Sequence, residues 1–384
     1  MSATVAQGFR AAGVSAGLKR PGVLDVALVV NDGPADTAAA VFTANRVKAA
    51  PVLWSQQAIA DGRARAVVLN SGGANACTGP AGFLDTHHTA ERVAAGLDIG
   101  AGDVVVCSTG LIGERLPIER LLRGVDAAIC ALSPHGASAA ADAIRTTDTV
   151  AKQSLAQHRD GWTVGGMAKG AGMLAPSLAT LLCVLTTDAV VDAATADKAL
   201  RTATSATFDR LDADGCMSTN DTVLLMASGA SNCTPPLDQF TDLVTHVCRS
   251  LAMQLLADAE GATKQIAIDV NGAASEQDAV EVGRAIARSN LLKCALFGND
   301  PNWGRVLAAI GTTRATFNAD KLDVAINGVH VCRGGTAGEP RQLVDLGGRN
   351  VSIRVDLHSG RDTAVIFTTD LSHGYVEENS AYSS

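Results

Sequence analysis

The sequence predicts an α+β protein whose sheets lie in layers between helices. Segments with the apolar spacing of helices alternate with short strands, some continuously apolar and others alternating with polar residues. Neither an internal repeat nor a Pro/Ser-rich linker divides the 384 residues, which argues against two loosely joined domains. Only 3% of the residues are aromatic, while 38 are Gly, so we expect a core of Ala, Val and Leu with closely approaching backbones.

The first half of the chain begins with two strand-like runs, LDVALVV and AAAVFTANRV, within residues 24–53. Between them stands the turn Asn31-Asp32-Gly33-Pro34, whose residue types predict a hairpin without fixing its register. The elements predicted next are a helix (WSQQAIADG), a strand at 64–70, a helix at about 82–97, a strand at 103–107 and two helical segments, IERLLRGVDAAICAL and ASAAADAIRTT.

The second half alternates helices and strands and ends in a strand-rich tail. The predicted elements are a helix at 192–207, a strand at 222–229, a long helix at 236–260, a strand at 264–272, a helix at 276–290 and strands near 322–331, 350–357 and 363–369. The sequence therefore predicts both buried and half-exposed strands together with long helices, as is typical of an α+β protein.

The central stretch of the chain runs from Gly165 to Ala189 and reads GGMAKGAGMLAPSLATLLCVLTTDA. Its first half is rich in small residues and its second half, from Thr180, is strand-like. Local pattern alone favours a flexible loop that leads into a buried strand. The alternative hypothesis is that the protein cuts its own Ala179–Thr180 bond, which would make the new N-terminal Thr180 a catalytic nucleophile.

Composition limits the class of protein. The net charge is −8 without a long basic run, so we expect no nucleic-acid partner and no binding to anionic lipid. No apolar run approaches the roughly 20 residues that span a bilayer. The nine cysteines have no metal-binding or paired spacing and indicate reduced thiols in a cytoplasmic protein; they are Cys77, Cys107, Cys130, Cys183, Cys216, Cys233, Cys248, Cys294 and Cys332.

One glycine-containing loop, STGLIG after the strand at 103–107, has residues suited to stabilising an anion. The Thr109 hydroxyl and the Gly110 N–H could donate to a developing oxyanion, an interaction that lowers reaction barriers by a few kcal/mol. The plainer interpretation is a strand-to-helix turn in which Ser108 or Thr109 caps the helix. The loop SGGANACTG at 71–79 is a second small-residue loop after a strand.

Acidic residues offer two further candidates. Glu260 stands at the end of the long predicted helix, before Gly261, where a carboxylate opposes the helix dipole. A partner such as Lys264, Lys169 or a substrate ammonium would offset that cost, and an exposed glutamate is the alternative. The run DRLDADG (Asp209 to Gly215) lacks calcium-loop spacing and predicts a solvated turn or a structural network.

Other motif classes are missing from the sequence. The eight histidines show no HExxH pattern, and neither a Walker loop nor a Rossmann fingerprint is present. We therefore expect neither a metal site nor a nucleotide cofactor.

Six motifs in order resemble those of a known family. They are NSGGANACTG at 70–79, CSTGLIGERLP at 107–117, TTDT at 146–149, KGAGMLAPSLATLL, DAEGATK at 258–264 and FGNDPNWGR at 297–305. The chain resembles the ornithine acetyltransferases, also called glutamate N-acetyltransferases, of the arginine pathway. The resemblance extends from GFRAAGVSAGLK at 8–19 to the terminal ENSAYSS, which leaves no room for a transit peptide and supports a cytoplasmic location.

This resemblance implies a precursor that cleaves itself into an α chain (1–179) and a β chain (180–384). It further implies a two-layer sheet core between helices and an α2β2 assembly. By position, Thr180 matches the nucleophile, and Thr109 and Gly110 match the oxyanion hole. The residues that match substrate-contacting positions are Thr147 (with Thr146 as the alternative), Lys169, Thr180, Glu260, Asn379 and Ser384.

The implied reaction moves an acetyl group from N2-acetyl-L-ornithine to L-glutamate through an acetyl-threonine. Acetyl-CoA is a second possible donor, and the sequence does not decide whether it is used. Charge suggests that Lys169 pairs with an α-carboxylate and Glu260 with the δ-ammonium of ornithine. The freed α-amine of Thr180, with an ordinary pKa of about 7.7–8.0, would act as the base.

Two other functions compete with this interpretation. One is an N-terminal-nucleophile aminopeptidase or amidohydrolase of the same fold, in which water is the acceptor. The other is a non-catalytic amino-acid-binding or structural protein, in which the central stretch is only a turn.

Overall fold

The computed structural model describes residues 2–175 and 181–381. The predicted cleavage-site residues Ala179 and Thr180 and the predicted substrate contact Ser384 lie outside these ranges. The chain forms two compact units. The first holds the described residues within 1–173, 177–209 and 216–255, and the second those within 174–176, 210–215 and 256–384.

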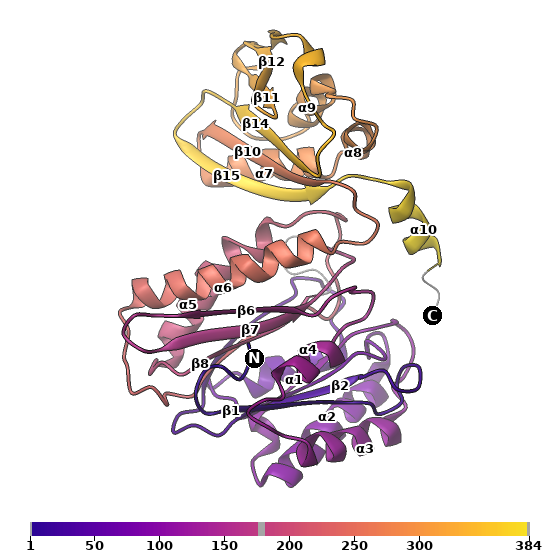
Figure 1. Ribbon diagram of the computed structural model, residues 1–384, viewed down its shortest axis with the longest axis vertical. Helices are drawn as coiled ribbons and strands as arrows, with labels where there is room; N and C mark the ends of the chain where they lie inside the picture. The colour runs from indigo at the N-terminus through magenta and orange to yellow at the C-terminus, as the bar shows by residue number, and fades with distance from the viewer. Residues whose placement is uncertain (1, 176–180, 382–384) are drawn as a thin grey trace. The chain divides into compact units, whose positions relative to one another are not determined.

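The first unit contains two sheets (Figure 1). The four-stranded sheet has the order β1-β2-β4-β5, formed by β1 (Phe9–Val14), β2 (Val26–Asn31), β4 (Ala66–Asn70) and β5 (Val104–Ser108). The five-stranded sheet has the order β3-β9-β8-β7-β6, formed by β3 (Thr37–Phe42), β9 (Thr222–Ala227), β8 (Leu182–Thr187), β7 (Thr163–Lys169) and β6 (Lys152–Gln157).

The two sheets pack face to face through small apolar side chains. Val29 and Leu69 of one sheet and Val184 and Leu224 of the other belong to one buried cluster. The helices of this unit are α1 (Ala50–Ala58), α2 (Gly79–Leu97), α3 (Ile118–Cys130), α4 (Ala137–Ala143), α5 (Ala193–Ser205) and α6 (Leu237–Ala257). Helices α2 and α3 cover the outer face of the four-stranded sheet, and α5 and α6 lie on the five-stranded sheet (Figure 1). The predicted two-layer sheet core between helices is confirmed in this unit.

The predicted hairpin at residues 24–53 is wrong. Strand β2 pairs with β1 and β4, whereas β3 pairs with β9 in the other sheet. The Asn31 side chain holds the connection, because its amide donates to Ala35 O at 2.9 Å and to Ala227 O at 3.3 Å. The turn residues therefore carry the chain from one sheet layer to the other.

The prediction of a loop beginning at Gly165 is also wrong, because β7 continues through Lys169. Gly165 lies in this strand against the N-terminal segment, and a Cβ added there would lie 1.9 Å from the Ser2 carbonyl oxygen. The small residues of this stretch thus allow close packing within a strand. Strands β1 and β6 were not predicted from the sequence.

The second unit contains a six-stranded sheet with the order β13-β12-β11-β14-β10-β15. Its strands are β10 (Gln265–Ala273), β11 (Asp323–Ile326), β12 (Val329–Arg333), β13 (Thr336–Ala337), β14 (Asn350–Asp356) and β15 (Asp362–Thr369). Its helices are α7 (Glu276–Ala287), α8 (Asn290–Phe297), α9 (Trp303–Ile310) and α10 (His373–Ala381). Ile268 of β10, Val282 of α7 and Val306 of α9 share its apolar core.

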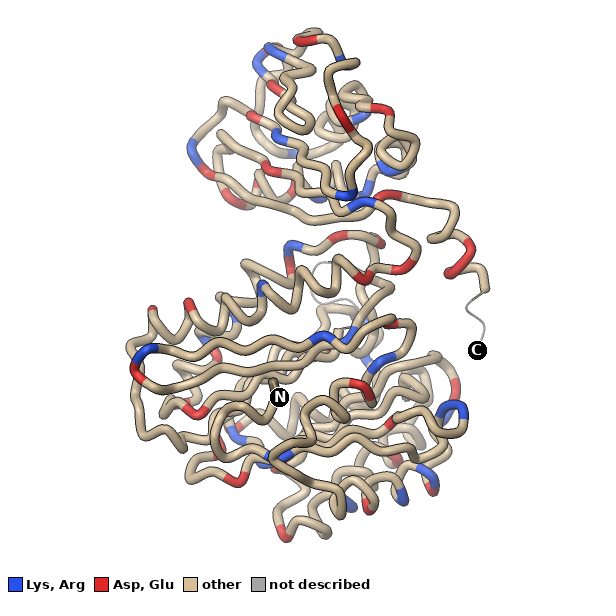
Figure 2. The backbone as a smooth tube through the Cα atoms, viewed as in Figure 1, with Lys and Arg blue, Asp and Glu red and all other residues tan. Residues whose placement is uncertain are grey.

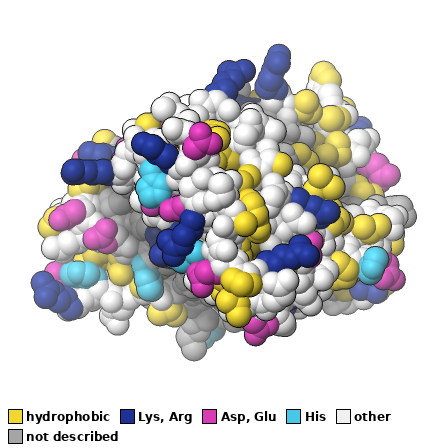
Figure 3. All heavy atoms as spheres, turned by 90° about the horizontal axis from the view of Figure 1, so that it is seen from above, with side chains coloured by type: hydrophobic (Ala, Val, Ile, Leu, Met, Phe, Trp, Pro, Cys, Tyr) yellow, Lys and Arg dark blue, Asp and Glu magenta, His cyan; other side chains and the backbone are white. Residues whose placement is uncertain are grey.

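Charged residues of both signs are interspersed along the backbone (Figure 2). The face drawn in Figure 3 likewise mixes basic, acidic and apolar side chains. Among the helices described, none has the length and apolar character needed to cross a membrane.

Candidate active site

The buried ammonium of Lys169 is the centre of a cluster of hydroxyl and carboxylate groups in the first unit. Its Nζ donates to Thr146 Oγ1 at 2.7 Å and to Thr109 Oγ1 at 3.4 Å. Asp148 Oδ2 lies 3.9 Å from the same nitrogen, and both side chains are almost completely buried. Lys169 ends β7, Thr109 follows β5, and Thr146 lies in the loop after α4, so three separate parts of the chain meet here.

Asp148 organises this cluster. Its Oδ1 accepts from Lys152 Nζ at 2.5 Å and from the Gly170 amide at 2.7 Å, and its Oδ2 accepts from the Thr146 amide at 3.0 Å. Burial acts to raise the pKa of Asp148, but the charges of Lys169 and Lys152 outweigh it and hold that pKa well below its usual value. The carboxylate is therefore ionised and fixes the loop to the end of β7.

A third lysine, Lys19, lies at the edge of this group. Burial lowers the pKa of Lys19 to about 8, partly offset by the carboxylate of Asp25. The charge of Lys169 lowers it further. Lys19 Nζ donates to the Arg145 carbonyl, just before Thr146.

The loop after β5 carries both predicted oxyanion donors and is held by backbone hydrogen bonds. The Thr109 amide donates to Asn70 O at 2.9 Å, and the Thr109 carbonyl accepts from the Gly73 amide at 3.0 Å. Because Lys169 donates to Thr109 Oγ1, the hydroxyl hydrogen is directed to another acceptor. Within the described residues, the Gly110 N–H donates to no carbonyl or side chain. The helix that follows, α3, has Pro117 at its N-cap position, so neither Ser108 nor Thr109 caps it. Thr109 and Gly110 lie in a loop held by backbone hydrogen bonds.

Gly110 is required by its backbone. Its φ of +138° lies in the region that L-residues rarely adopt, and an added Cβ would lie 2.6 Å from the Gly73 nitrogen. The loop at 71–79 therefore packs directly against the Thr109–Gly110 segment.

Asn220, just before β9, joins these loops to the five-stranded sheet. Its Nδ2 donates to Ala74 O at 2.6 Å and to Ser108 O at 2.8 Å. Strand β9 is parallel to β8, and β8 is antiparallel to β7, with Lys169 paired with Leu182. The residue before β8, Leu181, donates its amide to Asp221 Oδ1 at 2.8 Å. The chain thus resumes after residue 180 beside the Lys169 cluster.

The other predicted site residues have the following positions. Thr147 is exposed, whereas its alternative, Thr146, contacts Lys169. Glu260 and Asn379 belong to the second unit. Asn379 is an exposed residue of α10 whose Nδ2 donates to Tyr375 O at 3.0 Å.

The predicted position of Glu260 at a helix end is wrong, because α6 ends at Ala257 and Glu260 lies in the turn that follows. The amide of Ala262 closes this turn onto Ala259 O at 3.1 Å. Lys264 Nζ donates to the carbonyls of Leu346 and Gly348. Glu260 is therefore not a residue of the last turn of α6, where a carboxylate would oppose the helix dipole.

The acidic run after Asp209 forms a structural network within the second unit. Asp212 Oδ2 accepts from Arg288 at 2.8 Å, and Asp214 Oδ2 accepts from the Leu174 amide at 2.6 Å. Across residues 2–175 and 181–381, no group of three His, Cys, Asp or Glu side chains is arranged to hold a metal ion.

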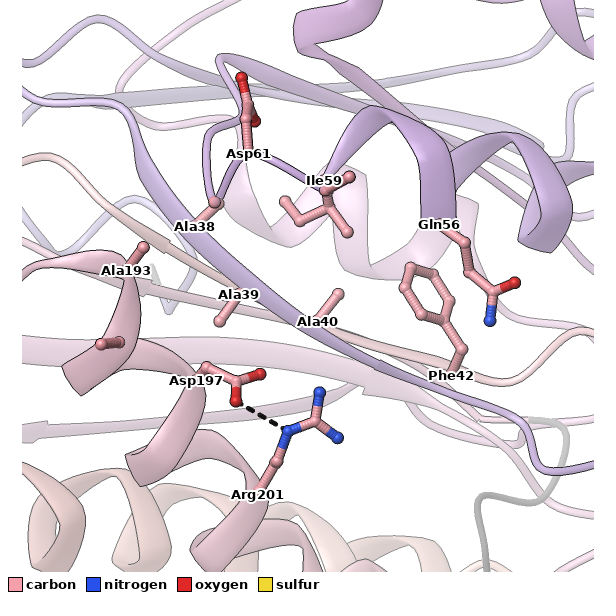
Figure 4. A pocket seen from close by; sticks show the side chains of 13 residues that line it. Ala38, Ala39, Ala40, Phe42, Gln56, Ile59, Asp61, Ala193, Asp197 and Arg201 are labelled. Atoms are coloured by element: carbon pink, nitrogen blue, oxygen red, sulfur yellow. Dashed lines mark hydrogen bonds and ion pairs between the residues drawn. The ribbon is translucent and has the colours of Figure 1, made fainter.

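A pocket of about 580 Å³ opens elsewhere on the first unit (Figure 4). The alanines Ala38–Ala40 of β3 line one side of it, and Arg201 of α5 is paired with Asp197 at 2.8 Å on another. None of the predicted site residues that the structure describes lines this pocket.

Sequence reasoning missed Asp148, Lys152, Asn220 and Asp221. Asp148 stands within the noticed TTDT motif, and Asn220 and Asp221 precede a strongly apolar strand, TVLLMA. A pair of polar residues at the start of a buried strand is a usable signal. Their partners, however, come from remote parts of the chain and are not visible in the local sequence.

A hydroxyl and a backbone N–H in a loop that a buried lysine contacts are a donor pair of the kind used by enzymes that act on acyl groups. A family model described as the ArgJ family matches residues 10–384. The chain is 64% identical over 384 residues to the arginine biosynthesis bifunctional protein ArgJ of Streptomyces avermitilis, with 100% of both chains covered. It is 64% identical over 383 residues to the protein of the same name from Thermobifida fusca, again with 100% of both covered. The chain belongs to the ArgJ family.

A solved structure is also similar. The arginine biosynthesis bifunctional protein argJ of Bacillus halodurans is 36% identical with a TM-score of 0.50. The match covers 52% of this chain and 98% of that chain. The solved chain is therefore about half as long as this one.

Proposed function

We propose that this protein transfers acetyl from N2-acetyl-L-ornithine to L-glutamate after cleaving its own Ala179–Thr180 bond. Full-length similarity to relatives named arginine biosynthesis bifunctional proteins supports the reaction class. The single structural observation that carries the proposal is the register of β7 and β8. Lys169 contacts Thr109 and is paired with Leu182 across the two strands. Residue 180 is only two positions before Leu182 in the sequence.

The length of the solved Bacillus halodurans chain supports the cleavage part of the proposal. That chain aligns over nearly all of its own length with 52% of this one. The proposed β chain, 180–384, is likewise slightly more than half of the 384 residues.

In the proposed cycle, the free α-amine of Thr180 takes the hydroxyl proton as the oxygen attacks the acetyl carbonyl. The negative oxygen of the tetrahedral intermediate accepts from the Thr109 hydroxyl and the Gly110 N–H. The α-ammonium then gives its proton to the leaving amine of ornithine. The α-amine of glutamate attacks the acetyl-threonine by the reverse route, and acetylglutamate leaves.

The assignment of substrate contacts follows from charge. Lys169 binds the α-carboxylate that both amino acids share, and Glu260 binds the δ-ammonium of ornithine. Thr147, Asn379 and Ser384 complete the proposed contacts, and exclusion of water from the site would preserve the acetyl-enzyme. Acetyl-CoA is a second candidate donor, and we expect a cytoplasmic α2β2 enzyme.

The assay compares products with and without glutamate. Incubation with acetylornithine and glutamate should yield acetylglutamate faster than free acetate. If acetate forms at the same rate whether or not glutamate is present, the protein is a hydrolase and the transfer function is wrong.

The cleavage is tested by a denaturing gel and by N-terminal sequencing of the β chain. The wild type should give two bands, one of which begins Thr-Leu-Leu-Cys. A Thr180→Ala chain should stay full length and transfer no acetyl, because it lacks the attacking hydroxyl. A Thr180→Ala chain that still splits at this bond would contradict the proposed nucleophile.

A further inference from the structure

Asp221 is a completely buried carboxyl next to the start of β8. Its Oδ1 accepts from the Leu181 amide at 2.8 Å. Its Oδ2 is also buried but accepts no hydrogen bond from any residue that the structure describes. The backbone around it is tightly held, because the Asp221 carbonyl accepts from the Thr43 amide at 3.0 Å and the Thr222 amide donates to Leu181 O at 2.9 Å.

An unsatisfied buried carboxyl oxygen is costly, so it calls for a partner. Burial raises the pKa of Asp221 well above its usual range. The Leu181 amide, the charge of Lys169, the Ser218 backbone and the Thr43 side chain offset this only in part. The nearby Thr43 hydroxyl does not satisfy Oδ2, because it donates to Ser218 O at 2.7 Å. A cation or a hydrogen-bond donor would therefore satisfy Asp221 Oδ2.

The covalent chain supplies such a group. The α-nitrogen of residue 180 is three bonds from the Leu181 amide nitrogen, which Asp221 already contacts. Self-cleavage converts that α-nitrogen from an amide into an amine, which becomes an ammonium when it takes a proton. We propose that Asp221 is a catalytic residue whose free carboxyl oxygen binds the α-ammonium of Thr180 and stabilises it during acetyl transfer.

This inference rests on the proposed function and adds a role for a residue outside it. When the amine accepts the hydroxyl proton, the positive charge that forms lies beside the Asp221 carboxylate. When the ammonium gives that proton to the leaving amine, the carboxylate retains its charge, so no other proton donor is needed. A nearby opposite charge favours the ammonium form and raises the pKa of the α-amine.

The other titratable groups on neighbouring strands do not replace Asp221. Lys169 on β7 carries the same sign of charge as the ammonium. Burial raises the pKa of the Cys107 thiol on β5 to about 12 and that of the Cys183 thiol on β8 well above its usual value, so both stay neutral.

The test compares Asp221→Asn with the wild type, and rates are counted per cleaved chain. The amide keeps the shape and the acceptor for Leu181 but removes the charge. We expect kcat to fall about 10-fold or more. The acidic limb of kcat/KM should move to lower pH by about one unit, because the amine loses its anionic partner.

A second measurement needs no substrate. The pKa of the Thr180 α-amine is obtained from the pH dependence of its modification by fluorodinitrobenzene, measured on the isolated β chain by mass spectrometry after labelling. It should fall in Asp221→Asn by the same amount. If Asp221→Asn does not cleave itself, the segments 1–179 and 180–384 are coproduced as separate chains, so that Thr180 still has a free α-amine. The wild-type protein is then produced in the same way for comparison.

Asp188→Asn is the matched control. Asp188 is buried at the opposite end of β8 and accepts backbone amides from Thr163 at 2.7 Å and Gln7 at 3.0 Å. Its substitution should leave both pH dependences unchanged. The inference is overturned if Asp221→Asn leaves the amine pKa and the acidic limb unmoved, including the case in which the rate alone falls. A wild type that is cut but makes no acetylglutamate would refute the proposed function, while the labelling would still report on Asp221.

Discussion

The Thr109 hydroxyl is contacted by the neighbouring ammonium of Lys169. Because the Lys169 ammonium donates to its oxygen at 3.4 Å, the Thr109 hydrogen remains available to another acceptor. The oxygen, and not the methyl group, accepts this hydrogen bond. The hydroxyl, rather than the size of the side chain, should therefore determine activity.

We expect Thr109→Ala to lower kcat by roughly 10²- to 10³-fold, the usual effect of removing one oxyanion donor. Thr109→Ser keeps the hydroxyl and should retain most of the activity. Steady-state kinetics of acetylglutamate formation measures both variants. Equal losses in the two would show that Thr109 acts through packing and not as a donor.

At the scale of elements, the loop between α4 and β6 depends on Asp148. This buried carboxylate binds the amides of Thr146 and Gly170 and the ammonium of Lys152. Lys152 begins β6 and Lys169 ends β7, and these two strand ends are neighbours in the sheet. The carboxylate of Asp148 therefore offsets the positive charges of both lysines. Removing the charge would leave two buried lysines without their common partner.

Asp148→Asn should lower the free energy of unfolding by about 3–5 kcal/mol, the usual cost of breaking a buried ion pair. The folded pKa of Asp148 is lowered, so its ionic contribution is complete above an ordinary aspartate pKa of about 3.9 and is lost as pH falls toward the folded value. The difference between variant and wild type should therefore shrink below about pH 4. Urea unfolding at several pH values measures it.

Asp142→Asn serves as the control for this prediction. Asp142 is half-exposed and pairs with Arg145 at 3.0 Å on the surface of the same region. Its substitution should cost no more than about 1 kcal/mol. A similarly small loss in Asp148→Asn would show that the buried cluster contributes little to folding.

Strand β7 provides a second prediction at this scale. A methyl group at Gly165 would collide with the Ser2 carbonyl, so Gly165→Ala should destabilise the fold by about 1–3 kcal/mol. Gly102→Ala is the matched control, since nothing lies within 4 Å of its added Cβ. Thermal unfolding of the two variants should separate them, and equal melting temperatures would contradict the close packing of β7.

At the scale of the molecule, the proposed cleavage site divides a sheet that both products share. Strands β3, β6 and β7 precede residue 180, whereas β8 and β9 follow it. The ladders β7–β8 and β3–β9 join the two segments through backbone hydrogen bonds. Their shared apolar core includes Met167 and Val184.

We therefore expect the two chains to remain together after cleavage. Native gel filtration with light scattering should give twice the 39.2 kDa protomer mass, as an α2β2 assembly requires. A denaturing gel of the same fraction should show both chains. Loss of the shorter chain without denaturant would contradict the shared sheet, and a mass of one protomer would contradict only the assembly.

The sequence predicted much of the fold because long helices and buried strands leave strong periodic patterns. One such local feature is the apolar strand TVLLMA. Another is the start of α5, where the Asp192 side chain caps the helix by accepting from the Thr195 amide at 2.7 Å. The pairing of β3 was mispredicted because a turn sequence constrains only its own residues. Which sheet β3 joins depends on β9, about 180 positions away.

The sequence by itself determined the class of fold, the family resemblance and the positions of Thr109, Gly110 and Lys169 along the chain. Only the tertiary structure showed that Lys169 contacts Thr109 and Thr146, that Asp148 neutralises two lysines, and that Asp221 lies against Leu181. The physical reason is that burial and charge pairing arise between segments remote in sequence. A local pattern records which groups a segment carries, whereas their environment exists only after the sheets have packed.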